Sequence, residues 1–165
     1  MIGCLVGSEM CIRDSIEAVM EENFKKTRLL LENGADVNIL CVENRRMELT
    51  ALSHAFDQGS SIVENLLFEH GANANVNGVS GEPLIVQSIA ENDLVAAQRF
   101  LEEGANPNVM NKDGCTPLAI AVAAEELNAV ELLIEAGADP SLSGAGMESP
   151  LLLAIENGNL SLIHI

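Results

Sequence analysis

The sequence predicts an all-α solenoid, in which short helix-turn-helix units stack on one another along the chain. Two recurring phrases carry this prediction. A phrase Gly-Ala-Asp or Gly-Ala-Asn recurs four times, and its glycines are separated by 37, 33 and 33 residues. A fixed period of roughly 20–50 residues is typical of repeats that bury their apolar faces on their neighbours. The four glycines are Gly34, Gly71, Gly104 and Gly137.

The second phrase has the form Thr-Pro-Leu and opens the first helix of each unit. Its leucines are separated by 32, 34 and 33 residues. A Thr or Ser followed by Pro is typical of a helix start, because the hydroxyl caps free N–H groups and Pro fits the first helical position. The variants begin at Thr50, Glu82, Thr116 and Ser149. After Thr116 the residues are small and apolar, which suits a helix packed between neighbours.

The second helix of each unit is amphipathic and ends at the glycine. In residues 128–135, Val130, Leu133 and Ile134 lie at i, i+3 and i+4, with glutamates on another face. Glycine just past the last turn can adopt the left-handed conformation that satisfies the free carbonyls. The next Asp or Asn is expected to shape the turn through its short polar side chain. These turn residues are Asp36, Asn73, Asn106 and Asp139.

These phrases and the period of 33 resemble the ankyrin repeat. Residues 113–141 follow the family pattern nearly position by position, and the resemblance covers about residues 18–159. Tetratricopeptide and HEAT arrays lack the Gly-Ala-Asp phrase at this distance from Thr-Pro-Leu. The resemblance implies an all-α ankyrin-repeat solenoid with extended loops or β-hairpins between the repeats. We expect an array over residues 16–159: a partial repeat at 16–44, repeats at about 45–77, 78–110 and 111–143, and a partial repeat at 144–159.

Several positions depart from the family pattern. Residues 39–49 include four more residues than the equivalent loop before Thr116, which predicts an elongated loop. Pro83 lies 21 residues before Gly104, one more than in the other repeats, which predicts an insertion near Ala90 to Asp93. Ala51 replaces the usual proline. The histidine that commonly follows the leucine is replaced by Ser53, Ile85, Ala119 and Leu152.

The two ends of the chain fit no repeat. If Met10 to Ser15 are encoded as ATG TGT ATA AGA GAC AGN, one frame of the reverse complement encodes Leu-Ser-Leu-Ile-His-Ile, which is the sequence of residues 160–165. Reverse-complementary ends resemble translated sequencing-adapter DNA. We therefore expect residues 1–15 and 160–165 to be an adapter artefact, and the array between them to be a fragment without its natural caps.

Composition and charge restrict the classes of ligand. The net charge is −17 and aromatic residues make up 2% of the chain, so nucleic acid and anionic membranes are not expected to bind. The array has no apolar run of about 18 residues, the length that spans a membrane. Its two cysteines, Cys41 and Cys115, form neither a disulfide framework nor a metal-ligand spacing. We expect a cytoplasmic protein, although secretion as an effector remains open.

The residues that catalysis would need are not arranged for it. His54 lies in a first helix, and His70 occupies a position that is Asn33, Glu103 or Ala136 in other repeats. The recurring glutamates of the second helix are expected to lie in water, without the apolar pocket that would separate their pKa values. They are Glu32, Glu69, Glu102 and Glu135. We expect no enzyme, no cofactor and no metal.

The resemblance implies a protein-binding module that contacts its partner through loop tips and the exposed ends of the first helices, which line a concave groove. The implied contact residues are Arg45, Arg46, Met47, Leu49, Asp57, Gln58, Gly78, Val79, Gly81, Ile89, Ala90, Lys112, Asp113, Cys115, Ala123, Ala124, Ala145, Gly146, Glu148, Glu156 and Asn157. The insertion is expected to shift the second-repeat residues by about one position.

The acidic residues of the second helices are expected to coat the opposite, convex side. They include Glu64, Glu69, Glu102, Glu103, Glu131 and Glu135. The groove contains Arg46 and Lys112, and Arg45 with Arg46 forms the densest basic pair. We expect a monomer when the array is properly capped. The alternative function is a targeting or regulatory segment of a larger enzyme or secreted effector.

Overall fold

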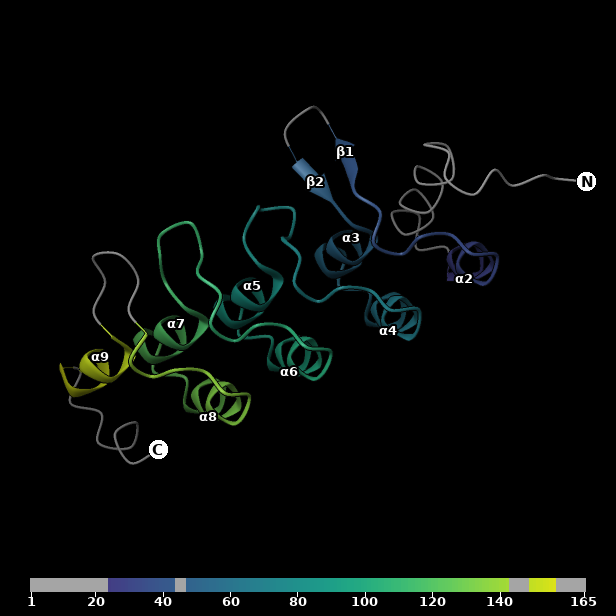
Figure 1. The fold of residues 1–165 in the computed structure, drawn as a ribbon. Helices are drawn as coiled ribbons and strands as arrows, with labels where there is room; N and C mark the ends of the chain where they lie inside the picture. The colour runs from purple at the N-terminus through teal and green to yellow at the C-terminus, as the bar shows by residue number, and fades with distance from the viewer. Residues whose placement is uncertain (1–23, 44–46, 143–148, 157–165) are drawn as a thin grey trace, which may run out of the picture. The chain divides into compact units, whose positions relative to one another are not determined.

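The computed structural model describes residues 24–43, 47–142 and 149–156 (Figure 1). The chain divides into two compact units, residues 1–81 and residues 82–165. Among the described residues, none of the helices is long and apolar enough to cross a membrane. Short helices in pairs make up both units, as the sequence predicts.

In the first unit, the described residues form three helices and one β-hairpin. The second helix of a repeat, α4, packs against the first helix α3 and against α2. The predicted long loop at residues 39–49 is in fact an antiparallel hairpin, with Cys41 opposite Leu49 and Glu43 opposite Met47. The elements are α2 (Phe24–Glu32), β1 (Cys41–Glu43), β2 (Met47–Leu49), α3 (Ala51–Asp57) and α4 (Ser61–Glu69).

The part of the second unit that the structure describes contains five helices in two layers. The first helices α5, α7 and α9 form one row in Figure 1, and the second helices α6 and α8 form the other. Helix α7 packs against α5, α8 and α9, so it is covered on three sides. The elements are α5 (Leu84–Ala90), α6 (Leu94–Glu102), α7 (Pro117–Ala123), α8 (Leu127–Glu135) and α9 (Pro150–Glu156).

Side-chain caps start most of the first helices, which confirms the interpretation of the Thr-Pro-Leu phrase. Thr50 Oγ1 accepts a hydrogen bond from the Ser53 N–H at 3.2 Å. Thr116 does the same for Ala119, and Ser149 accepts from the Leu152 N–H. Each cap satisfies one of the N–H groups that a helix start leaves without an intrahelical partner.

The predicted insertion near Ala90 to Asp93 is wrong. The N-cap of α5 is Pro83, so this proline takes the position of Thr50 and Thr116 rather than that of Pro117. Helices α3, α5 and α7 are each seven residues long, and the left-handed residue that follows each of them recurs every 33 residues, at Gly59, Asn92 and Glu125. The apparent extra residue came from aligning the leucines of the phrase, because Ile85, and not Leu84, takes the position of Leu118.

The Gly-Ala-Asp phrase ends the second helices as predicted. Its glycines have φ between +82° and +87°, the left-handed region that favours glycine. Each following Asp or Asn accepts a hydrogen bond from the backbone N–H two residues later, at 2.8–3.0 Å. The phrase is therefore part of the scaffold in both units.

Asparagines two residues further on connect consecutive loops within each unit. Asn108 Nδ2 donates to the Gly137 carbonyl at 3.3 Å, and its Oδ1 accepts from the Asp139 N–H at 2.8 Å. Asn38 makes the same pair of bonds to Gly71 and Asn73, at 3.0 and 2.7 Å. One side chain thus fixes the position of the next loop.

The core consists of apolar residues that recur at equivalent positions of the helices. The largest completely buried side chains include Leu52, Leu67, Leu84, Phe100, Leu118 and Leu133. Among the described residues, the carboxylate of Glu64 is a charged exception. It was expected on the solvated side, but it is only 4% exposed and takes the position of Ala97 and Val130, which face the interior. A carboxylate therefore occupies a core position, and it has an interaction partner there.

Candidate functional site

Exposed residues at the ends of the first helices form a stripe in the second unit. We define the stripe as Gln87 and Ala90 of α5 with its C-cap Glu91, and Ile120 and Ala123 of α7 with its C-cap Ala124. The spacing i, i+3, i+4 places the three residues of each helix on one side, and α5 and α7 pack against each other. Ala90, Glu91, Ala123 and Ala124 are exposed, while Gln87 and Ile120 are half-buried.

The stripe combines methyl groups with a fixed polar pair. Gln87 Nε2 donates to Glu91 Oε1 at 2.9 Å, one helical turn away. The stripe also carries the exposed methyl groups of its alanines and the half-buried Ile120. The surface can therefore offer van der Waals contact and hydrogen-bonding groups together. In the first unit, Asp57 and Gln58 take the same helical positions and are exposed.

Three predicted contact residues are buried and are therefore not part of the candidate binding surface. Leu49 and Ile89 are core side chains, only 3% and 4% exposed, and Gly78 is buried as well. Ile89 was selected because the phrase was aligned on Leu84, one residue out of register, and its true equivalents are Phe56 and Val122, which are also buried. The position that the sequence reasoning needed was Glu91.

The loop between α6 and α7 carries the second part of the candidate surface. Its tip is a turn in which the Gly114 N–H donates to the Asn111 carbonyl, and Gly114 has a φ of +79°. Asn111 Oδ1 accepts from the backbone N–H groups of both Asp113 and Cys115, at 3.0 and 2.7 Å. This network holds the exposed side chains of Lys112 and Asp113 on an ordered tip, and Cys115 is half-buried below them.

Lys112 is tied to the preceding loop. Its backbone N–H donates to Glu82 Oε2 at 3.2 Å, and its Nζ lies 3.7 Å from Glu82 Oε1. Residues 79 and 81, which were also predicted as contacts, are half-buried. The charge of Lys112, which the sequence analysis offered as a basic feature of the groove, is thus partly offset by Glu82.

The remaining predicted contacts cannot be placed on this surface. Met47 lies in β2 and Glu156 at the end of α9. The other predicted contacts lie outside the described residues: Arg45, Arg46, Ala145, Gly146, Glu148 and Asn157.

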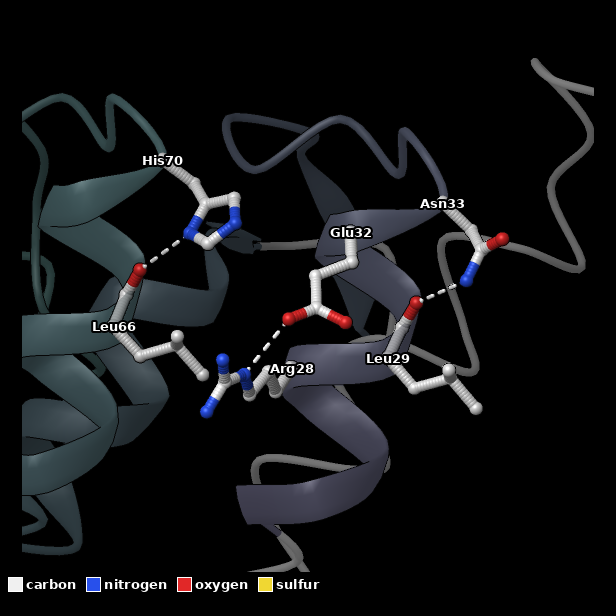
Figure 2. Close-up of polar contacts among 6 residues, drawn as sticks. All are labelled: Arg28, Leu29, Glu32, Asn33, Leu66 and His70. Atoms are coloured by element: carbon white, nitrogen blue, oxygen red, sulfur yellow. Dashed lines mark hydrogen bonds and ion pairs between the residues drawn. The ribbon is translucent and has the colours of Figure 1, made fainter.

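Polar side chains also gather at the ends of the second helices α2 and α4 in the first unit (Figure 2). Asn33 Nδ2 donates to the Leu29 carbonyl at 2.7 Å, and His70 Nδ1 lies 2.9 Å from the Leu66 carbonyl. A carbonyl only accepts, so Nδ1 carries the proton in this contact. Both side chains satisfy a carbonyl near a helix end, which is a structural role.

An ion pair completes this group. Arg28 Nε donates to Glu32 Oε1 at 2.8 Å within α2, as Figure 2 shows. This hydrogen bond and the negative charge of Glu32 raise the pKa of Arg28, and Glu69 adds to the effect. Both side chains are well exposed, so the pair contributes little to stability.

The other titratable candidates hold equally ordinary positions. His54 is buried in α3, and the recurring glutamates of the second helices are exposed, as expected. Within residues 24–43, 47–142 and 149–156, no group of three or more His, Cys, Asp or Glu side chains could hold a metal ion.

Sequence reasoning missed Gln87, Glu91 and Ile120 as members of the stripe. The signal that could have found them was the strict 33-residue spacing of the glycines from Gly71 onward. Counting back from Gly104 and Gly137 aligns α5 with α7 correctly. Counting forward from Leu84 and Leu118 places α5 one residue out of register.

Comparison with protein families identifies the repeat. A family model described as ankyrin repeats in three copies matches residues 84–165. The matched range begins at the first residue of α5. A search of curated proteins finds no significant match. Ankyrin repeats generally mediate protein–protein interaction and are typically non-catalytic. The repeated helix pairs, the glycine-ended turns and this match agree, and the chain is an ankyrin repeat protein with an all-α solenoid fold.

Proposed function

We propose that this protein is a non-enzymatic binding module, and that it contacts a protein partner through the stripe and the tip of the 110–114 loop. The main support for the proposal is that apolar groups are exposed to solvent at positions outside the core. Ala123 and Ala124 end α7 with both methyl groups exposed, and Met110 is 40% exposed on the neighbouring loop.

The rigidity of this surface supports the proposal. The Asn111 network orders the loop tip, and the contact of Glu82 with Lys112 links that tip to the residue preceding α5. A surface that is ordered before binding loses less conformational entropy when a partner docks. Such a surface suits a folded partner or an extended peptide better than a small substrate.

The opposite side of the second unit has a different character. The exposed side of its second helices carries mainly charged and amide groups, such as Gln98 and Glu102, which are hydrogen-bonded to each other at 2.9 Å. Glu131 and Glu135 are exposed on α8. Solvation explains these residues, so this side provides the matched control surface.

A selection experiment tests the proposal without knowledge of the natural partner. The full chain is used to select ligands from a phage-displayed peptide library, and the selected peptides are then measured by calorimetry. We expect Ala123→Arg to weaken binding at least about 10-fold, because an arginine would displace a partner from the stripe. Glu131→Arg, on the opposite side, should change the Kd less than about 2-fold.

The control is an unchanged fold in both variants, measured by circular dichroism and thermal unfolding. Equal losses in both variants, or losses only in Glu131→Arg, would show that the stripe is not the binding surface. The cytoplasmic location remains a prediction.

A further inference from the structure

Carboxylates lie beside methyl groups at the ends of α5 and α7. Glu91 follows Ala90 of α5, and Glu125 follows Ala123 and Ala124 at the end of α7. All five side chains are exposed. Because α5 and α7 pack against each other, their ends lie about one interhelical distance apart, roughly 8–10 Å. A surface of this composition can contact an aliphatic chain and a positive charge together.

The described part of the second unit is strongly acidic. Residues 82–142 and 149–156 carry twelve acidic side chains and two basic ones, Arg99 and Lys112. Lys112 Nζ lies 3.7 Å from a carboxylate oxygen of Glu82, and Arg99 belongs to α6, in the row of second helices. The stripe itself contains no basic residue. The negative potential over the stripe attracts a basic partner and repels an acidic one.

Glu125 has an unusual backbone conformation. Its φ is 59°, in the left-handed region, where the equivalent residues are Gly59 and Asn92. Glycine and asparagine adopt this region more readily than glutamate does. Strained backbone positions of this kind cluster at functional sites. The strain therefore supports a role for the Glu125 carboxylate in binding rather than in the fold.

We propose that the partner docks through a basic extended segment with lysine or arginine at positions i and i+2, an inference that rests on the proposed function of the stripe. In an extended chain these two side chains point to the same side, about 7 Å apart. Their aliphatic stems would lie over Ala123 and Ala124, and their charged groups would reach Glu91 and Glu125. A basic side chain thus uses both components of the surface, the methyl groups and the carboxylates.

Peptides selected on the full chain from the phage-displayed library test the inference, and Ala123→Arg identifies those that bind the stripe. We expect these peptides to carry the basic pair. Their Kd should rise at least about 10-fold when NaCl is raised from about 0.01 M to about 1 M, because the screening length falls from about 30 Å to about 3 Å.

A pair of double variants locates the charge that the peptides contact. In about 0.15 M NaCl, Glu91→Gln with Glu125→Gln should weaken binding about 3- to 30-fold. The matched control, Glu131→Gln with Glu135→Gln, removes the same charge from exposed positions of α8 and should change the Kd less than about 2-fold.

Glu125→Gly tests the strained position by itself. Glycine is the residue at the equivalent Gly59, so Tm should be unchanged or higher while the Kd rises. A lower Tm would show that the Glu125 side chain stabilises the turn and would contradict its role in binding.

Three further results would overturn the inference. Stripe-binding peptides without basic residues, whose Kd does not change with salt, would refute the basic partner and leave the proposed function intact. Equal losses in the two double variants would show a general attraction to the acidic chain rather than contacts at the stripe. If Ala123→Arg weakens the binding of none of the selected peptides, the proposed function itself fails, and the inference fails with it.

Discussion

The asparagine that joins consecutive loops is the most informative single residue to perturb. Asn108 makes two hydrogen bonds to the following loop, to Gly137 and Asp139, while its own backbone N–H donates to Asn106 Oδ1 at 2.9 Å. Substitution by alanine removes the two side-chain bonds and leaves the third in place. Asn108→Ala therefore isolates the contribution of the connection between loops.

The expected loss follows from the number and exposure of these bonds. A hydrogen bond typically contributes about 0.5–1.5 kcal/mol of net stability. Asn108 is half-buried, so water can partly replace both partners and the lower half of this range applies. We expect Asn108→Ala to lower the free energy of unfolding by about 1–2 kcal/mol, and Tm by roughly 2–8 °C.

Urea unfolding followed by circular dichroism measures this loss, with Asn128→Ala as the control. Asn128 is exposed on α8, where alanine is a better helix former, so the control should stay within about 0.5 kcal/mol of the parent. Asn38→Ala should behave like Asn108→Ala, because Asn38 makes the same two bonds. If Asn108→Ala were as stable as the control, the connection between loops would not contribute to folding and the reasoning would be refuted.

Four further substitutions test the core, the helix ends and the turns. Leu133→Ala should cost about 2–5 kcal/mol, because Leu133 is completely buried, and Leu127→Ala, at a 37% exposed position, less than half as much by urea unfolding. Gly104→Ala should cost about 1–2 kcal/mol in the same assay from backbone strain alone, since φ is +86° and a Cβ would meet nothing within 4 Å. Hydrogen bonds from the Ser141 side chain and backbone lower the pKa of Asp139. The ionised Asp139 therefore contributes its full stabilisation of the folded state at pH values above its pKa in the unfolded chain, about 3.9. This contribution is lost as the pH falls through the lower pKa that Asp139 has in the folded protein. An NMR titration should show that Ser141→Ala raises the pKa of Asp139 towards its ordinary value; an unchanged pKa would contradict this cause.

The sequence predicted the repeating parts of the fold because their causes are local. A glycine that ends a helix, an Asp or Asn that accepts from the N–H two residues later, and a Thr that caps the next helix each act within a few residues. These features need no information about neighbouring repeats. The family, the all-α class and the positions of the helices followed from them.

The sequence-based predictions were wrong where the exposure of a side chain had to be inferred from the residue type or from an alignment. Glu64 was placed on the solvated side because glutamate usually lies there, but its helical position is the one that Ala97 and Val130 bury. Ile89 was selected for the surface through an alignment that was one residue out of register. The second error follows from the period of 3.6 residues in a helix, where a shift of one position turns a side chain by about 100°.

The sequence by itself determined the repeat, its period and the chemistry of its turns, because these depend on short-range hydrogen bonds and backbone conformation. Only the tertiary structure decided which side of each helix faces a neighbour. It buried Ile89 and Glu64, and it exposed Leu151, Leu152 and Ile155 of α9. Burial depends on which helices pack against one another, and that is a property of the stacked repeats rather than of any one of them.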